Sequence, residues 1–169
     1  MQVQEWLARV TKTPITVTNS STNSSYLTED YFPLDQSVYV DATHDTVISA
    51  IATTLNLSSL ATSGDPPTDH IPDDYSFVVS KIAPFASNLH SQIMSCPASS
   101  ASSDKDLFVR WILNDGVMPL SHIPGCGDAS DGRCSLDAYV SAITGLTQSI
   151  DWAYDCRECC IPETRTSWC

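Results

Sequence analysis

A polar turn, Thr43-His44-Asp45, carries the residues best suited to chemistry in this sequence. It follows the β-prone range 37–42 and precedes the range 47–56, whose apolar residues recur with the 3.6-residue period of a helix. Ligands of α/β proteins bind beyond the carboxyl ends of strands, where the amides of a helix N-terminus are free to bind anions. The pattern therefore predicts a strand, a ligand-binding turn and a helix, with His44 and Asp45 at the ligand.

A structural role is the alternative for the same two residues. Aspartate is common at helix N-termini, so Asp45 would then only cap the helix, and His44 would bond to a loop. A histidine-aspartate dipeptide alone does not separate these two roles.

The rest of the sequence predicts the elements that must position this turn. Residues 2–10 have helical spacing that Pro14 ends, and the Ser-, Thr- and Asn-rich range 16–35 predicts a loop. The other expected elements are a loop over 58–74, an extended segment over 84–94, a polar connection over 95–106, a strand over 107–113, a hairpin turn at Asn114-Asp115-Gly116 leading into 117–120, and a helix over 136–143 with Ser135 as its N-cap.

Composition and charge limit the classes of function. With 169 residues, 42% of them hydrophobic and 17% charged, the chain is long enough for one folded core. Eight lysine and arginine residues against 20 acidic residues give a net charge of −12, which repels a nucleic-acid backbone, so no nucleic-acid partner is expected. No apolar run approaches the roughly 20 residues of a membrane span, and the amphipathic start is not a signal peptide, so no membrane partner is expected.

Cysteines and glycosylation signals nevertheless favour a secreted protein. Seven cysteines are typical of an oxidising compartment, and Asn-x-Ser acceptors stand at Asn19, Asn23 and Asn56. Because these signals occur without a signal peptide, we expect the natural N-terminus to lie upstream of Met1.

Several longer stretches place the turn in a wider pattern. They cover 2–10, 32–34, 38–45, 84–87, 109–120, 125–126, 132–134 and 151–156. In this order they resemble the late portion of the histidine acid phosphatase family, in its secreted phytase-type branch. The Leu-Asn-Asp-x-Val-x-Pro-Leu stretch at 113–120 and the Gly-Arg-Cys stretch at 132–134 are far more specific than a dipeptide.

The resemblance implies an α/β fold, namely the C-terminal part of a three-layer, phosphoglycerate mutase-like histidine phosphatase domain with a mixed sheet, expected to be incomplete here. It assigns 1–156 to that domain and leaves a cysteine-rich tail at 157–169. It also implies a two-step phosphomonoesterase without a cofactor, acting on substrates such as inositol phosphates. His44 matches the histidine that contacts the phosphoryl group, and Asp45 matches the proton donor to the leaving alcohol. Both roles suit the chemistry, because phosphoryl oxygens carry negative charge and an alkoxide leaves poorly without a proton.

The nucleophile of that family is absent from the sequence. In the family, a histidine of an Arg-His-Gly-x-Arg-x-Pro motif attacks phosphorus. No Arg-His-Gly occurs here, and His70, His90 and His122 have no nucleophile or metal-ligand spacing, so each is expected in a loop or on a strand surface. The isolated chain is therefore expected to be inactive. The alternative is a noncatalytic secreted binding module derived from the same fold, whereas a complete enzyme with another nucleophile has no supporting residues.

The cysteines divide into three groups. Cys126 and Cys134 bracket a short Gly- and Asp-rich loop, and the resemblance supports a disulfide between them. Cys96 and Cys156 match family cysteines whose partners lie in an earlier part, so both are expected to lack a partner here. The remaining cysteines, Cys159, Cys160 and Cys169, lie in the tail. Together with Cys156 they could form a zinc site, but a second pair of ligands with matching spacing is missing, so disulfides are favoured there.

Overall fold

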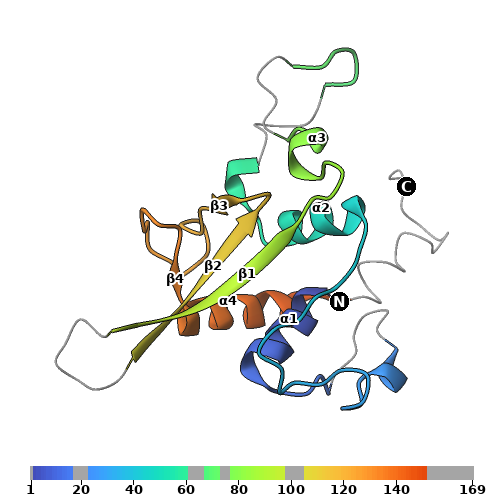
Figure 1. The fold of residues 1–169 in the computed structure, drawn as a ribbon. Helices are drawn as coiled ribbons and strands as arrows, with labels where there is room; N and C mark the ends of the chain where they lie inside the picture. Colours follow the sequence, from blue (N-terminus) through green and yellow to red (C-terminus); the bar gives the residue numbers. More distant parts are fainter. Residues whose placement is uncertain (1, 17–22, 61–66, 73–76, 98–104, 152–169) are drawn as a thin grey trace, which may run out of the picture. The chain divides into compact units, whose positions relative to one another are not determined.

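The chain folds as two compact units. The computed structural model describes residues 2–16, 23–60, 67–72, 77–97 and 105–151 (Figure 1). One unit combines Met1–Val40 with Ile143–Cys169, and the other is Asp41–Ala142; we call them the terminal unit and the central unit. The terminal unit is thus discontinuous in sequence, whereas the central unit is one continuous stretch that includes His44 and Asp45.

Helix α1 (Gln2–Thr11) opens the terminal unit, which confirms the helix predicted over 2–10. Val3 and Ala8 are buried on its apolar face. The helix ends where Lys12 adopts a left-handed backbone with φ of 52° and the amide of Thr13 donates to the carbonyl of Ala8 over 3.0 Å.

The range 23–40 follows with little regular structure. It contains one 3₁₀ turn, η1 (Ser24–Tyr26). The strand predicted over 37–42 is wrong, because the backbone there pairs with no strand, and Val38 and Val40 are 75% and 87% exposed. Extended backbone becomes a stable strand only when a neighbouring strand takes its hydrogen bonds, and none of the described strands pairs with this range.

The central unit is built on an antiparallel sheet (Figure 1). Strand β2 (Lys105–Leu113) pairs on one side with β1 (Leu89–Pro97) along its whole length, and on the other side with the short strands β3 (Gly116–Met118) and β4 (Cys134–Ser135). The strand predicted over 107–113 is confirmed. The extended segment begins later than the predicted residue 84, and both long strands continue into the range predicted as a polar connection, because each residue of β1 has a partner on β2.

Helices and 3₁₀ turns complete the described elements. They are α2 (Asp45–Thr54), η2 (Ser58–Leu60), α3 (Val79–Ile82) and α4 (Leu136–Ser149). The predicted helices over 47–56 and 136–143 are confirmed, although α4 is longer than predicted. Ser135 lies in β4, directly before α4, and pairs across the sheet with Phe108.

A two-residue turn joins β2 to β3, as the sequence predicts. Asn114 and Asp115 have φ values of 47° and 68°, the left-handed backbone that suits a tight antiparallel hairpin. The Asn114 side chain donates to the carbonyls of Lys81 and Ile82, at 3.0 and 2.8 Å, and accepts from the amide of Asn88 at 3.1 Å. One side chain therefore fastens the hairpin to the end of α3 and to the chain just before β1.

The core of the central unit forms on one face of β2. Val109 and Trp111 are buried there, and Tyr139 of α4 is 0% exposed. Burial raises the pKa of the Tyr139 hydroxyl above its ordinary value, because the phenolate would lose its hydration, and a side-chain hydrogen bond with Trp111 acts weakly in the opposite direction. The α4 helix is thus packed on the sheet through a tyrosine that stays protonated.

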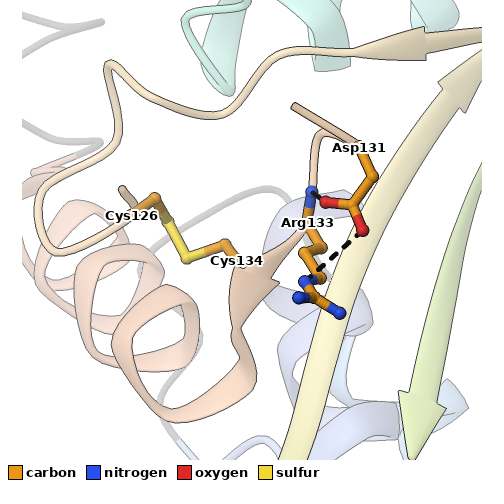
Figure 2. The surroundings of a disulfide bond; sticks show 4 residues. All are labelled: Cys126, Asp131, Arg133 and Cys134. Atoms are coloured by element: carbon orange, nitrogen blue, oxygen red, sulfur yellow. Dashed lines mark hydrogen bonds and ion pairs between the residues drawn. A yellow bond between two sulfur atoms is a disulfide. The ribbon is translucent and has the colours of Figure 1, made fainter. Parts of the chain in front are cut away.

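A disulfide between Cys126 and Cys134 closes the loop before α4 (Figure 2). The two Cα atoms are 5.0 Å apart and both residues are buried. Inside this loop the Asp131 carboxylate accepts from the Arg133 amide at 3.3 Å and lies 3.4 Å from the Arg133 guanidinium. Gly132 has φ of 70°, and a Cβ at this position would collide with a side chain of β3. The disulfide expected from the sequence is present.

Candidate active site

His44 and Asp45 stand at the start of α2. His44 is the N-cap residue: its backbone is extended, and its carbonyl accepts from the amides of Val47 and Ile48 at 3.0 and 3.3 Å. Asp45 is the first helical residue, and its carboxylate accepts from the amide of Thr46 at 2.7 Å. Both side chains are exposed and neither makes an ion pair with any described residue. The turn therefore presents an imidazole and a carboxyl group to solvent at a helix N-terminus.

Helix α2 forms because its apolar side chains share one face. Ile48 and Ala52 are buried on that face, and Leu55 is buried directly after the helix. The chain then turns through Asn56, whose φ is 47°, while His122 lies 3.3 Å from the carbonyl of Leu55. The helix is thus anchored by its buried face and its C-terminal end, which leaves its N-terminus open to solvent.

The other histidines lie in separate environments. His70 is exposed in a loop, with Nδ1 2.8 Å from a carboxylate oxygen of Asp69. His90 is exposed on β1, and His122 is half-buried in the segment between β3 and β4. The placement in loops or on a strand surface agrees with the prediction, and the structure brings none of the three into a hydrogen bond with His44 or Asp45.

One arginine contact of the terminal unit was missed from the sequence. The guanidinium carbon of Arg9 lies 5.0 Å from the ring centroid of Phe32 and 4.9 Å from that of Tyr39. These are cation–π distances. The available signal was that all three residues belong to stretches that carry the family resemblance, although nothing in their spacing predicts that they meet.

A pocket of about 350 Å³ lies beside this contact in the terminal unit. Phe32 lines the pocket together with other apolar and charged side chains: Lys12, Pro14, Leu27, Glu29, Leu34 and Asp35. Neither His44 nor Asp45 lines it. The pocket therefore adds no group to the candidate active site.

Metal-ligating side chains do not gather in the part of the chain that the structure describes, where no group of three or more could hold an ion. Cys96 on β1 is a half-buried free thiol, 4.0 Å from the Arg133 guanidinium. Cys156 and the three cysteines of the tail, Cys159, Cys160 and Cys169, lie outside the described residues. Among the described helices, none has the length and apolar character needed to cross a membrane.

Two predicted glycosylation acceptors lie among the described residues and both are exposed. The Asn23 carboxamide oxygen accepts from the amide of Ser25 at 3.1 Å and from its hydroxyl at 2.7 Å. Asn56 follows α2 in a left-handed backbone conformation. Asn19 lies outside the described residues.

Comparison with known proteins places the chain in a family. Residues 3–114 match the histidine phosphatase superfamily (branch 2), and the chain belongs to that superfamily. The α/β class expected from the sequence is confirmed, since an antiparallel sheet with helices is consistent with part of a histidine phosphatase domain.

Curated relatives include phytases and an acid phosphatase. Phytase A of Aspergillus terreus is 30% identical over 156 residues, which are 90% of this chain and 31% of the relative. Phytase A of Aspergillus awamori is 31% identical over 88% of this chain and 30% of the relative, and acid phosphatase PHO1 of Komagataella pastoris is 32% identical over 73% and 25%. The chain therefore spans less than a third of the length of these relatives.

Proposed function

We propose that this chain is the C-terminal portion of a secreted histidine acid phosphatase of phytase type, a phosphoric monoester hydrolase. The observation that carries the proposal is the His44-Asp45 pair, exposed at the N-terminus of α2 in a chain of the histidine phosphatase superfamily. Similarity to Phytase A and to an acid phosphatase supports a phosphate ester as the substrate class. Inositol phosphates and other phosphomonoesters are the candidate substrates.

The proposed chemistry divides between this chain and a nucleophile that it lacks. A histidine of an Arg-His-Gly motif attacks phosphorus, and the bond from phosphorus to the leaving oxygen breaks. Asp45 gives its proton to that oxygen, and His44 contacts the phosphoryl oxygens next to the positive end of the α2 dipole. Water then hydrolyses the phosphohistidine. No Arg-His-Gly occurs in the sequence, so the isolated chain does not complete this cycle.

The net charge of the chain favours an acidic working medium. At neutral pH a net charge of −12 repels a polyanionic substrate. Acid protonates part of the 20 acidic side chains and part of the substrate, so the repulsion weakens as pH falls.

We propose that the protein is secreted because it has a disulfide and exposed asparagines in glycosylation signals. The Cys126–Cys134 disulfide fits an oxidising compartment, and exposed Asn23 and Asn56 leave room for attached glycans. With Asn19 they are the proposed glycosylation sites. The proposed organisation is a phosphatase domain portion at 1–156 followed by a cysteine-rich tail at 157–169.

A noncatalytic binding module is the second candidate, and one contact favours it. The bond of 2.7 Å from the Thr46 amide to the Asp45 carboxylate is what a purely structural residue at a helix N-terminus would make. In that case, replacing Asp45 by a residue that cannot donate a proton would not lower the rate of phosphate-ester hydrolysis.

Substitution of Asp45 by asparagine separates the two candidates. Asparagine keeps an oxygen that can accept from the Thr46 amide but removes the proton donor. The test protein joins this chain to the remaining two thirds of Phytase A from Aspergillus terreus. We expect Asp45→Asn to lower kcat on an inositol phosphate by about 100-fold or more, and on p-nitrophenyl phosphate far less, because nitrophenolate leaves without a proton.

His44→Ala serves as the comparison, because the proposed contact of His44 is with the phosphoryl group that both substrates share. It should lower kcat/KM on both by similar factors. Equal losses on the two substrates in Asp45→Asn would show that Asp45 is structural. The isolated 169-residue chain should not turn over either substrate. If it does, and Asp45→Asn abolishes that turnover, the proposal that the nucleophile lies outside this chain is wrong.

A further inference from the structure

Two exposed tyrosines of the terminal unit lie against each other in the irregular range that follows α1. Tyr26 and Tyr31 are 60% and 70% exposed. Their ring centroids are 5.7 Å apart and the ring planes meet at 88°, an edge-to-face arrangement. In the described part of the chain, no hydrogen bond engages either hydroxyl. The pair therefore presents ring surfaces and two hydroxyls to solvent.

The backbone holds this pair in a defined place. The Tyr26 amide donates to the carbonyl of Asn23 at 3.1 Å, and the Tyr31 amide donates to the carbonyl of Thr28 at 3.1 Å, so each ring follows a closed turn. Leu27, between the two turns, is half-buried. Two local turns and one half-buried leucine thus fix an aromatic pair that stays exposed.

A glycosylation acceptor begins the first of these turns. The bond from the Tyr26 amide keeps the Cα atoms of Asn23 and Tyr26 within about 7 Å of each other. The Asn23 carboxamide oxygen accepts from the amide and the hydroxyl of Ser25, whereas its nitrogen donates to none of the described residues. That nitrogen is the atom to which an N-linked glycan is attached. The folded turn therefore holds the oxygen and leaves the reactive atom free.

Charge around the pair favours a neutral ligand. The range 23–31 contains Glu29 and Asp30 but no lysine or arginine, so an anionic ligand would be repelled. A sugar ring is neutral. It has a face of C–H groups that packs on the negative face of an aromatic ring, and hydroxyls that can bond to tyrosine hydroxyls. A carbohydrate thus fits the pair better than a phosphate or an acidic peptide.

We propose that Tyr26 and Tyr31 bind the first sugar residues of a glycan attached to Asn23; the proposal rests on the proposed function, in particular on secretion. The donor is an oligosaccharide linked to a lipid diphosphate. The Asn23 nitrogen attacks the anomeric carbon, the bond from that carbon to the diphosphate oxygen breaks, and the lipid diphosphate leaves with the electron pair. The nitrogen gives one proton to a base of the transferase. The carboxamide keeps its oxygen, so both bonds to Ser25 persist in the glycoprotein.

Asn56 provides the matched comparison. It begins another acceptor signal and is exposed, but residues 53–60 contain no aromatic side chain. A glycan on Asn56 should therefore move freely, whereas one on Asn23 should rest on the two rings.

NMR spectroscopy of the glycoprotein provides the test. The 169-residue chain is made in yeast behind a cleavable leader that directs it to the secretory pathway. One form keeps only Asn23 (Asn19→Gln, Asn56→Gln), and its control keeps only Asn56 (Asn19→Gln, Asn23→Gln). With the glycan on Asn23, we expect the C–H protons of the first two N-acetylglucosamine rings to shift upfield from their positions in the free disaccharide, because an aromatic ring shields protons above its face. The glycan on Asn56 should keep the free positions.

Variants of the rings decide whether the shift comes from this pair. Tyr26→Ser and Tyr31→Ser should each reduce it, and the double variant should abolish it. Tyr26→Phe keeps the ring and should keep the shift. An unchanged shift in the double variant, or equal positions for the two glycans, would overturn the proposal. Peptide mass spectrometry that finds no glycan on Asn23 would also overturn it.

A second copy of the chain would be the competing occupant of the pair. If the form without an Asn23 glycan dimerises in sedimentation and Tyr26→Ser with Tyr31→Ser prevents this, the pair binds protein and the proposal is wrong. Enzyme activity has no part in this test. Unchanged turnover in Asp45→Asn together with shifted glycan protons would therefore contradict the phosphatase function alone, whereas a glycan on Asn56 but not on Asn23 would contradict only the present proposal.

Discussion

Asn114 shows that a residue of a family-specific stretch can have a structural role. It lies in the Leu-Asn-Asp stretch, one of the two stretches most specific to the family, and its side chain donates to the carbonyls of Lys81 and Ile82 and accepts from the amide of Asn88. Its backbone also adopts the left-handed conformation that asparagine tolerates better than most residues. Specificity of a stretch therefore does not by itself locate chemistry.

Replacement of Asn114 by alanine should lower the free energy of unfolding by about 2 to 4 kcal/mol. Each lost hydrogen bond costs about 1 kcal/mol, the two carbonyls and one amide lose a partner, and alanine is strained at positive φ. Urea unfolding followed by fluorescence measures the change. Asn88→Ala is the control, because Asn88 bonds to Asn114 only through its backbone, and an equal loss in both variants would contradict this account.

Tyr139 should make the protein sensitive to alkali. Burial raises the pKa of its hydroxyl, so the folded state keeps the proton at pH values where the unfolded chain, with an ordinary pKa of about 10, releases it. Stability is therefore constant for this group below about pH 10 and falls as pH rises further. Tyr139→Phe should flatten that decline in urea midpoints measured from pH 9 to 11.

The exposed Tyr26 offers the comparison for this titration. Tyr26→Phe should leave the alkaline decline as it is in the wild type, because this side chain is 60% exposed. If both variants flatten the decline equally, or neither does, Tyr139 is not its source.

At the scale of single residues, local sequence predicted that His44 and Asp45 directly precede a helix, but it did not predict the Arg9 contact. The turn is marked by its immediate neighbours, since a helical period begins directly after it. Arg9 contacts Phe32 and Tyr39, which are distant from it in sequence, and cation–π contacts leave no periodic signature. The spacing and the exposed position of Asp45 suit a proton donor and a structural residue at a helix N-terminus alike, so only substitution separates the two roles.

Elements that depend on local information were predicted well. Helices α1, α2 and α4 follow their apolar periods, and the β2–β3 hairpin follows its Asn-Asp-Gly turn. Elements that depend on distant partners were not. The range 37–42 has strand composition but pairs with none of the described strands, and the ends of β1 and β2 are fixed by their register with each other and not by their residues.

The Cys126–Cys134 disulfide should stabilise the element that it closes, the loop before α4. The two cysteines are eight positions apart, and a loop of that length corresponds to about 2 to 3 kcal/mol in the chain-entropy model. We expect a double Cys126→Ala, Cys134→Ala variant to lose about that much in urea unfolding at neutral pH, with Cys96→Ala in every background to exclude exchange with the free thiol.

Reduction of the disulfide gives the matching control. A reductant should lower the midpoint of the parent but not that of the double variant. Peptide mapping under non-reducing conditions that finds both cysteines as free thiols in the secreted protein would contradict the bond itself.

At the scale of the whole molecule, the central unit contains most of what a stable fold needs. It holds the sheet, the disulfide and the buried residues Val109, Trp111 and Tyr139 in one continuous stretch. The terminal unit instead combines two parts that are distant in sequence, and its range 23–40 includes exposed Val38 and Val40. The two units should therefore differ in how far they fold alone.

A fragment covering 41–149 should fold without the rest of the chain. It keeps α4 whole, and Trp111 is its sole tryptophan, so fluorescence reports only on the core of the central unit. We expect blue-shifted emission, a disulfide between Cys126 and Cys134 and a single cooperative transition in urea. The corresponding fragment 2–40 should show helix content no greater than that of an isolated peptide, since short helices are marginal in water. Emission of a solvent-exposed indole from the 41–149 fragment would contradict its independence.

The discontinuous terminal unit also sets an order of events during synthesis. During synthesis α1 and its neighbours leave the ribosome before the central unit, whereas the residues from Ile143 onward, which complete the terminal unit, follow after about a hundred intervening residues. The central unit emerges as one piece, with a local hairpin and a short disulfide loop, so it can fold while translation continues. Residues 2–40 must wait, exposed to chaperones and proteases, until the residues from Ile143 onward arrive. A pause in translation near residue 142 would prolong that interval and leave residues 2–40 exposed for longer.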